Sequence, residues 1–144
     1  MQQYQRILVA MDGSKESEAA LNRAIQMVNG QDQAIITLAN VIDPKAFESV
    51  SSFDNNMVDA MADQARQSME KYRKQATDAG VKNVDYTIEF GSPKSKIARD
   101  LPKELNADLI IMGASGLNAV ERFVEGSVTS YVSRVAQIDV LIVR

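Results

Sequence analysis

Five short runs of mostly apolar residues, separated by longer segments with helical spacing, constrain the fold of this chain more than any other feature. Runs of this length that are continuously apolar or rich in β-branched residues are typical of strands in a parallel sheet that is covered on both faces. The runs are Ile7–Met11, Ala34–Ile42, Val84–Phe90, Leu109–Gly113 and Val140–Val143. Right-handed crossovers between such strands predict an α/β fold, a doubly wound five-stranded parallel sheet with helices on both faces. The length of 144 residues predicts a single domain over residues 1–144.

The segments between the runs carry helix start and stop signals. Ser14 is a good N-cap for a first helix, and Ser92-Pro93 supplies an N-cap followed by a proline at the first helical position. Pro102 should kink its helix or end it early. A short last helix is predicted over Ser127–Val135. The polar connection over residues 43–56 is long enough to suggest a functional loop.

The residue types that the chain lacks exclude several kinds of chemistry. It has no cysteine and no histidine, which excludes disulfides, zinc–thiolate sites, a Ser-His-Asp triad and imidazole metal ligands. A net charge of -3, with four Phe and four Tyr and no basic stripe, disfavours a nucleic-acid partner. The sequence has no apolar run of about 18 residues and no signal-peptide layout, so we expect no membrane association and a cytoplasmic location.

The strongest functional signal follows the fourth strand. Gly113-Ala114-Ser115-Gly116 is followed by nine residues and then by Gly126-Ser127. Glycines after a buried strand let the backbone turn tightly and bring N–H groups close to an anion. Gly126-Ser127 opens a helix whose free N–H groups and positive dipole end suit phosphate, and Ser115 and Ser127 can add hydroxyl donors. The pattern indicates a phosphate site, with a tight turn and a plain helix start as the alternative.

Asp12 is the second candidate, because it directly follows the first strand. Asp12, Glu16 and Glu18 together make the start of the first helix a poor place for phosphate, since like charges repel. Asp12 is better suited to accept hydrogen bonds from ribose hydroxyls or from an adenine amino group. A role in the turn or as a cap is equally open from the sequence.

Other nucleotide and catalytic motifs are absent. The chain has no P-loop and no Gly-x-Gly-x-x-Gly after the first strand. Leu117 stands where a nucleophile elbow has its last glycine, and no histidine is present to activate Ser115, which excludes a hydrolase triad. The third strand ends in Phe90-Gly91, without the aspartate that a response-regulator receiver would need.

With Gly113-x2-Gly116-x9-Gly126-Ser127 placed after the fourth strand, the chain resembles the universal stress protein family in its ATP-binding branch. The likeness spans the whole chain, through ILVAMDGSKESEAAL, ANVID, ADLIIMGASG, EGSVTSYV and VLIVR. The resemblance implies the strand order 3-2-1-4-5, which makes the first and fourth strands neighbours. It also implies a homodimer, formed through the edge strand Val140–Val143, whose apolar residues a second chain would cover.

The resemblance implies a role for each matching residue. Asp12 would hold the ribose, Ala10 and Met11 would line the base pocket, and Val41 would contact adenine through its backbone. The residues around the phosphates of ATP would be Gly113, Gly116, Gly126 and Ser127, with Ser115 and Val128 beside them. Mg²⁺ would bridge the phosphates, largely through water, since no protein ligand for it is apparent.

Three hypotheses about function follow. The first is an ATP-binding regulatory protein of the stress response that changes the loops at residues 43–56 and 114–126, with at most slow hydrolysis or self-phosphorylation and no catalytic residue assigned. The second is a dimeric interaction module with a vestigial pocket. The third is a nucleotide hydrolase or transferase that uses a metal-activated water.

Overall fold

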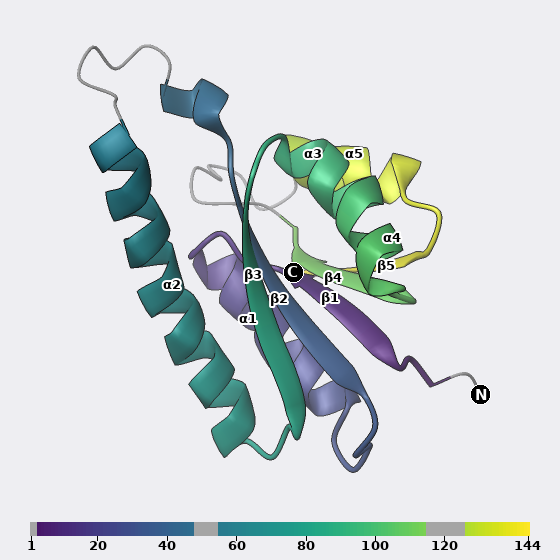
Figure 1. The fold of residues 1–144 in the computed structure, drawn as a ribbon. Helices are drawn as coiled ribbons and strands as arrows, with labels where there is room; N and C mark the ends of the chain where they lie inside the picture. Colours follow the sequence, from purple (N-terminus) through teal and green to yellow (C-terminus); the bar gives the residue numbers. More distant parts are fainter. Residues whose placement is uncertain (1–2, 48–54, 115–125) are drawn as a thin grey trace.

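The computed structural model describes residues 3–47, 55–114 and 126–144 of the chain (Figure 1). Its elements in chain order are β1 (Arg6–Ala10), α1 (Lys15–Met27), β2 (Ile35–Ile42), the 3-10 helix η1 (Pro44–Phe47), α2 (Asn55–Asp78), β3 (Asn83–Phe90), α3 (Pro93–Ser95), the π-helical segment η2 (Lys96–Asp100), α4 (Leu101–Leu105), β4 (Leu109–Gly113), α5 (Ser127–Val135) and β5 (Asp139–Val143). The first and last residues of each predicted strand differ by at most one position from those observed.

The five strands form one parallel sheet in the order β3-β2-β1-β4-β5. The chain winds outward from β1 to β3 and then returns to the other side of β1, where β4 pairs with it from Ile7 opposite Leu109 to Val9 opposite Ile111. The predicted fold class and strand order are therefore confirmed. Between β1 and β4 the winding direction reverses, and folds of this kind bind ligands beyond the carboxyl ends of the strands at that point.

Two apolar cores lie on the two faces of the sheet. Ile7 and Val9 belong to the core covered by α1 and α2, whereas Leu8 belongs to the core covered by α3, η2, α4 and α5. Figure 1 shows the two helix layers on opposite sides of the strands. Because successive side chains of a strand point to opposite faces, the residue number along β1 tells which core a side chain joins. In the described part of the chain, no helix is both long enough and apolar enough to cross a membrane.

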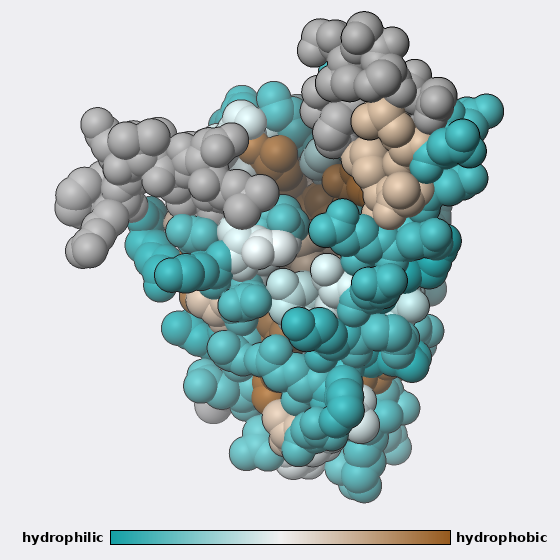
Figure 2. Space-filling model, turned by 90° about the vertical axis from the view of Figure 1, so that its left-hand side faces the viewer, coloured by the Kyte–Doolittle hydropathy of each residue, from teal (hydrophilic) through white to brown (hydrophobic). Residues whose placement is uncertain are grey.

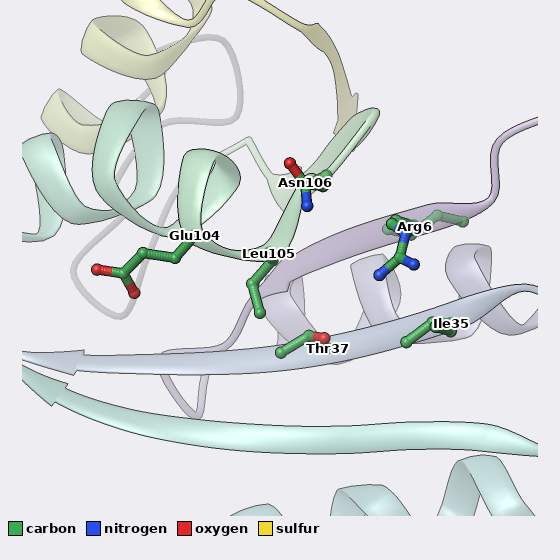
Figure 3. A pocket seen from close by; sticks show the side chains of 8 residues that line it. Arg6, Ile35, Thr37, Glu104, Leu105 and Asn106 are labelled. Carbon is green, nitrogen blue, oxygen red and sulfur yellow. The ribbon is translucent and has the colours of Figure 1, made fainter.

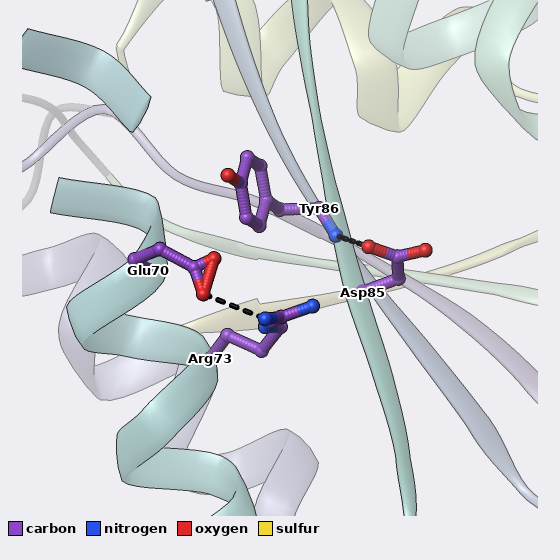
Figure 4. A network of polar contacts seen from close by, with 4 residues as sticks. All are labelled: Glu70, Arg73, Asp85 and Tyr86. Atoms are coloured by element: carbon purple, nitrogen blue, oxygen red, sulfur yellow. Dashed lines mark hydrogen bonds and ion pairs between the residues drawn. The ribbon is translucent and has the colours of Figure 1, made fainter. Parts of the chain in front are cut away.

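A polar network holds α2 against the edge strand β3 (Figure 4). Arg73 Nη2 lies 2.7 Å from Glu70 Oε1, and the Arg73 guanidinium carbon lies 5.8 Å from the centre of the Tyr86 ring. Tyr86 N–H donates to Asp85 Oδ1 at 2.8 Å. Exposed ion pairs contribute little on their own, so the main hold on α2 comes from its buried residues Met69 and Ala76.

Pro102 was expected to kink its helix or to end it early, and the structure excludes the early end. The helical chain continues through α4 to Leu105 and stops at Asn106, whose backbone is left-handed with φ of 52°. In η2 the Leu101 N–H bonds to the Lys96 carbonyl, five residues earlier. A proline normally clashes with the carbonyl four residues before it, and the wider π turn directly ahead of Pro102 makes room for its ring.

Gly113, the last residue of β4, lies against the first turn of α1. A Cβ atom at this position would stand 2.7 Å from Glu16 Cβ and 2.8 Å from the Glu16 carbonyl oxygen. Separations this short do not occur between real Cβ atoms and backbone, so an added methyl group would push α1 away from the sheet. Gly113 is therefore required for packing, whatever else it does.

We expect Gly113→Ala to lower the free energy of unfolding by about 1–3 kcal/mol, the usual cost of overpacking a tight contact. Urea denaturation followed by circular dichroism measures it. The control is Ser68→Ala on the exposed side of α2, which should change stability by less than about 0.5 kcal/mol. Equal stability of the Gly113 variant and the wild type would contradict the close approach of β4 and α1.

Tyr72 of α2 reaches across to α1, where its hydroxyl donates to Glu18 Oε1 at 3.2 Å. Burial raises the pKa of the Tyr72 phenol, and the negative charges of Glu18 and Asp12 raise it further. A phenol whose pKa is higher in the folded state than in the unfolded chain stabilises the fold below the unfolded value of about 10. That contribution is lost as the pH rises through the folded pKa.

Wild-type stability should accordingly fall as the pH rises above about 10, and Tyr72→Phe should fall less steeply over the same range because it has no phenol to ionise. Thermal unfolding between pH 8 and pH 11 provides the comparison. Parallel curves for the two proteins would show that Tyr72 does not contribute to the alkaline loss of stability.

Candidate functional site

The carboxyl ends of β1 and β4 lie next to each other at the centre of the sheet, and each is followed by a candidate residue. Asp12 follows β1 by two residues, and Ala114 follows β4 directly. Figure 2, which views the molecule from the side of α2, shows apolar side chains gathered in the upper part, where the strands end, on an otherwise mostly hydrophilic face. Both the topology and the surface place the candidate site at this edge.

The turn after β1 is held by hydrogen bonds within the turn and to β2. Asp12 Oδ1 accepts the Ser14 N–H at 2.9 Å and also the Ser14 hydroxyl, while Gly13 provides the left-handed residue at φ of 84°. Ser14 Oγ in turn accepts the Ser17 N–H at 3.1 Å and so caps α1. The turn role of Asp12 is thus real. It occupies one carboxylate oxygen, and Oδ2 of this exposed residue has no protein partner within the described residues.

The predicted base-pocket residues divide between the two faces of the sheet. Ala10, Val41 and Val128 are half-buried and pack against the same core, on the face that α5 covers. Met11 instead has its side chain buried in the opposite core, with 2% of its surface exposed. Its backbone N–H donates to the Ala39 carbonyl at 2.8 Å. Met11 could therefore border a pocket on the α5 face only through its backbone.

The start of α5 is fastened to the end of β4 by two hydrogen bonds. Gly126 N–H donates to the Ala114 carbonyl at 3.0 Å, and the buried Thr129 hydroxyl donates to the Gly113 carbonyl at 2.9 Å. Ala114 N–H continues the sheet by donating to the Val143 carbonyl at 3.0 Å. The N–H of Gly126 is therefore already used by the protein, and it is not available to an anion.

The next three N–H groups of α5 remain as donors. Ser127, Val128 and Thr129 form the first turn of α5, and their N–H groups have no acceptor within the described residues. Ser127 is exposed, and the N-cap Gly126 has no side chain to cap them. A helix start of this kind attracts anions through its N–H groups and its dipole.

The start of α1 differs from that of α5 both in its cap and in its charge. Ser14 caps it, and Glu16 and Glu18 place negative charge in its first turn. Its donors are partly used and its charge repels anions, and the prediction that phosphate avoids this helix start stays a prediction.

Ser115 and Gly116 lie outside the described residues, so their predicted roles beside the phosphates stay predictions. The described residues 3–47, 55–114 and 126–144 contain no group of three or more Asp or Glu side chains that could hold a metal ion. The described edge thus supplies a carboxylate acceptor, a set of main-chain N–H donors and an apolar wall.

Three further residues shape this edge and were missed from the sequence. Asn40 Nδ2 donates to the Met11 carbonyl at 3.1 Å and fixes the backbone just before Asp12. Thr129 anchors α5, and Lys94 of α3 places its ammonium 5.9 Å from the centre of the Tyr131 ring on α5. Asn40 and Thr129 lie within segments that the resemblance already covers, ANVID and EGSVTSYV, but only coordinates show what their side chains bond.

The chain matches known proteins over nearly its whole length. The model of the universal stress protein family matches residues 3–144. A protein of Staphylococcus aureus strain USA300, named as a universal stress protein, is 47% identical over 141 residues, which are 98% of this chain and 84% of the relative.

Solved structures agree with this match. Universal stress protein UspA from Lactobacillus plantarum superposes with a TM-score of 0.85 at 30% identity, covering 100% of both chains. A universal stress protein solved in complex with cAMP superposes with a TM-score of 0.68 at 26% identity, covering 99% of this chain and 98% of the other. The match over residues 3–144, together with these relatives and the fold, shows that the chain belongs to the universal stress protein family.

Proposed function

We propose that this universal stress protein binds an adenine nucleotide, with ATP as the main ligand, at the carboxyl ends of β1 and β4. The observation that carries the proposal is the uncapped start of α5, fastened to the end of the strand that pairs with β1. Free N–H groups at a helix start suit phosphate. The relative solved with cAMP supports an adenine nucleotide as the class of ligand.

Each part of the nucleotide has a group suited to it. The phosphates would accept hydrogen bonds from the first turn of α5, beginning at Ser127, and Ser115 and Gly116 would complete the phosphate loop. The ribose hydroxyls would donate to Asp12 Oδ2. The base would lie on the α5 face of the sheet, against Ala10 and Val41.

A regulatory role fits this site better than fast catalysis. The chain has no histidine, and the described residues hold no acidic cluster for a metal, so Mg²⁺ would be held by phosphate oxygens and water. A nucleotide regulates only by binding one arrangement of the protein better than another, and the segments at residues 43–56 and 114–126 are the proposed readout. The cytoplasm, which supplies ATP, is the proposed location.

A second candidate, an interaction module with a vestigial pocket, is favoured by two observations. Gly113 is required for packing against α1, and the N–H of Gly126 is used by Ala114. Two of the motif glycines thus have reasons to be present that involve no ligand. The free donors at Ser127, Val128 and Thr129 weigh against this candidate.

We further propose a homodimer through β5. Among the described residues this edge strand pairs with β4 alone, and Val140, Leu141 and Ile142 are half-buried. Because Val143 directs its carbonyl to Ala114, the alternate residues Val140 and Ile142 direct their N–H and carbonyl groups outward. A second chain could pair with these groups.

Isothermal titration with ATP and Mg²⁺, and in parallel with AMP and cAMP, tests nucleotide binding. Asp12→Asn keeps an oxygen for Ser14 but replaces the free oxygen with an NH₂ group, which cannot accept from ribose, so affinity should fall by about tenfold or more. The control Asp85→Asn changes an exposed carboxylate of β3 that likewise accepts a main-chain N–H, that of Tyr86 at 2.8 Å, and it should leave affinity unchanged.

A second pair of variants tests the helix start itself. Ser127→Pro removes the first N–H donor of α5 at a position where proline is compatible with the helix, whereas Ser127→Ala removes only the hydroxyl. The proline variant should bind ATP about tenfold more weakly than the alanine variant. Absence of saturable heat with every nucleotide at millimolar concentration would reject the proposal in favour of the vestigial pocket.

A pair of variants at Ile142 tests the dimer. Ile142→Pro removes an outward N–H group without changing the pairing of β5 with β4, whereas Ile142→Val keeps that N–H group. Light scattering after size-exclusion chromatography should give a dimer for the wild type and the valine variant and a monomer for the folded proline variant. A monomeric wild type would refute dimerisation through this edge.

A further inference from the structure

A cavity of about 210 Å³ lies at the opposite edge of the sheet from the nucleotide site, where the strands begin. Its wall comes from the start of β1, the first half of β2, and the turn between α4 and β4. The labelled lining residues in Figure 3 are Arg6, Ile35, Thr37, Glu104, Leu105 and Asn106. None of them belongs to the nucleotide site proposed above.

The cavity arises because the helix layer on this face ends before the strands do. The left-handed backbone of Asn106 stops α4 and turns the chain toward β4, so on this face none of the described helices extends over the first residues of β1 and β2. Ile35 and Thr37 point to this face, because the alternate residues Ile36 and Leu38 are buried in the opposite core. Ile35 and Thr37 remain half-buried.

The charge in the cavity comes from Arg6, which is exposed. Within the described residues its guanidinium has neither an ion pair nor a hydrogen bond. The neighbouring carboxylate of Asp108 forms hydrogen bonds with the main chain, where it accepts the N–H groups of Gln5 and Arg6 at 2.8 and 3.0 Å. Figure 3 shows the Glu104 carboxylate extending away from Arg6, beyond Leu105. Among the described residues, the Arg6 guanidinium thus forms no ion pair with an acidic side chain, while Asp108 keeps its negative charge beside the main chain of Arg6.

Two neutral polar side chains border the same space. The hydroxyl of Thr37 and the amide of Asn106 have no hydrogen-bond partner in the described part of the chain, and Figure 3 places both beside the opening that Arg6 borders. Ile35 and Leu105 supply apolar walls. The combination is one guanidinium, two hydrogen-bonding side chains and an apolar floor.

We infer that this cavity binds a small organic carboxylate with a compact apolar body. A guanidinium matches the two oxygens of a carboxylate with two parallel hydrogen bonds, and the apolar walls suit a short hydrocarbon or aromatic part. A cavity of about 150 Å³ accepts benzene, so this one has room for a molecule of the size of benzoate. A phosphate dianion suits it less, because Arg6 is the one cationic side chain among the described lining residues and Glu104 lies at the rim.

Titration of the full-length, ¹⁵N-labelled protein with benzoate, followed by NMR, tests this inference. The amide signals of Thr37 and Asn106 should shift and saturate. Benzamide, which has the same shape without the charge, should bind at least tenfold more weakly, and inorganic phosphate should not saturate these signals. Equal binding of benzamide and benzoate, or tighter binding of phosphate, would overturn the assignment to a carboxylate.

Variants of Arg6 provide a second test of benzoate binding. Arg6→Gln should weaken benzoate about tenfold or more, and Arg6→Lys, which keeps the charge but loses the planar fork, should lie between it and the wild type. The main-chain bonds of Arg6 to Asp108 survive both changes, so the fold should persist, as the NMR spectrum itself reports. The control Arg23→Gln removes an exposed arginine of α1 and should bind like the wild type. Unchanged affinity of Arg6→Gln would refute the site, whatever the outcome of the ATP titrations.

Discussion

The parallel pairing of β1 with β4 is the constraint on which the rest of the structure depends. It brings together two chain exits that are about one hundred residues apart in sequence, one leading to a capped, acidic helix start and the other to an uncapped one. The glycine at the end of β4 lets α1 approach closely, and the hydroxyl of Thr129 ties α5 to the same strand end. The edge therefore has a fixed frame before any ligand is considered.

The two helix starts at this edge differ in their charge and in the hydrogen bonds that they can form. At α1, Ser14 caps one main-chain N–H group and the two glutamates repel anions, so this exit is suited to accept hydrogen bonds, chiefly through Asp12. At α5, no side chain of the described residues caps the first turn, so this exit is suited to donate hydrogen bonds. A ligand that has hydroxyl donors at one end and an anionic acceptor at the other meets both needs, and a nucleoside phosphate has that polarity.

Much of the frame could be predicted from the sequence, because burial on both faces leaves a plain apolar signature. β4 and α5 begin and end at the predicted residues, and the strand order followed from the family resemblance. What could not be predicted depends on contacts in space. Alternation puts Met11 on the same face as Ile7 and Val9, but only the structure shows that this face is the one away from α5. Pro102 was expected to kink its helix or end it early, and no local sequence pattern predicts the π turn that accommodates it.

The candidate site divides in the same way. Asp12 and the α5 start stand out because polar or glycine residues follow buried strands, but the sequence could not tell that Gly126 N–H is already bonded or that Gly113 is needed for packing. Arg6 gave no signal at all. An arginine at the start of a strand is unremarkable until the end of α4 is seen to leave the space beside it open.

The hydrogen bond between Gly126 and Ala114 has a consequence for how relatives should be recognised. It joins the two residues that flank segment 115–125. The end of β4 and the start of α5 are therefore held together by a contact that does not involve that segment. Insertions or deletions in that segment would leave α5 in place. Homologues with a different number of intervening residues would then escape a motif defined by fixed spacing, while sharing the same joined ends. Searching for those ends, with the gap left free, would be the more faithful criterion of common architecture.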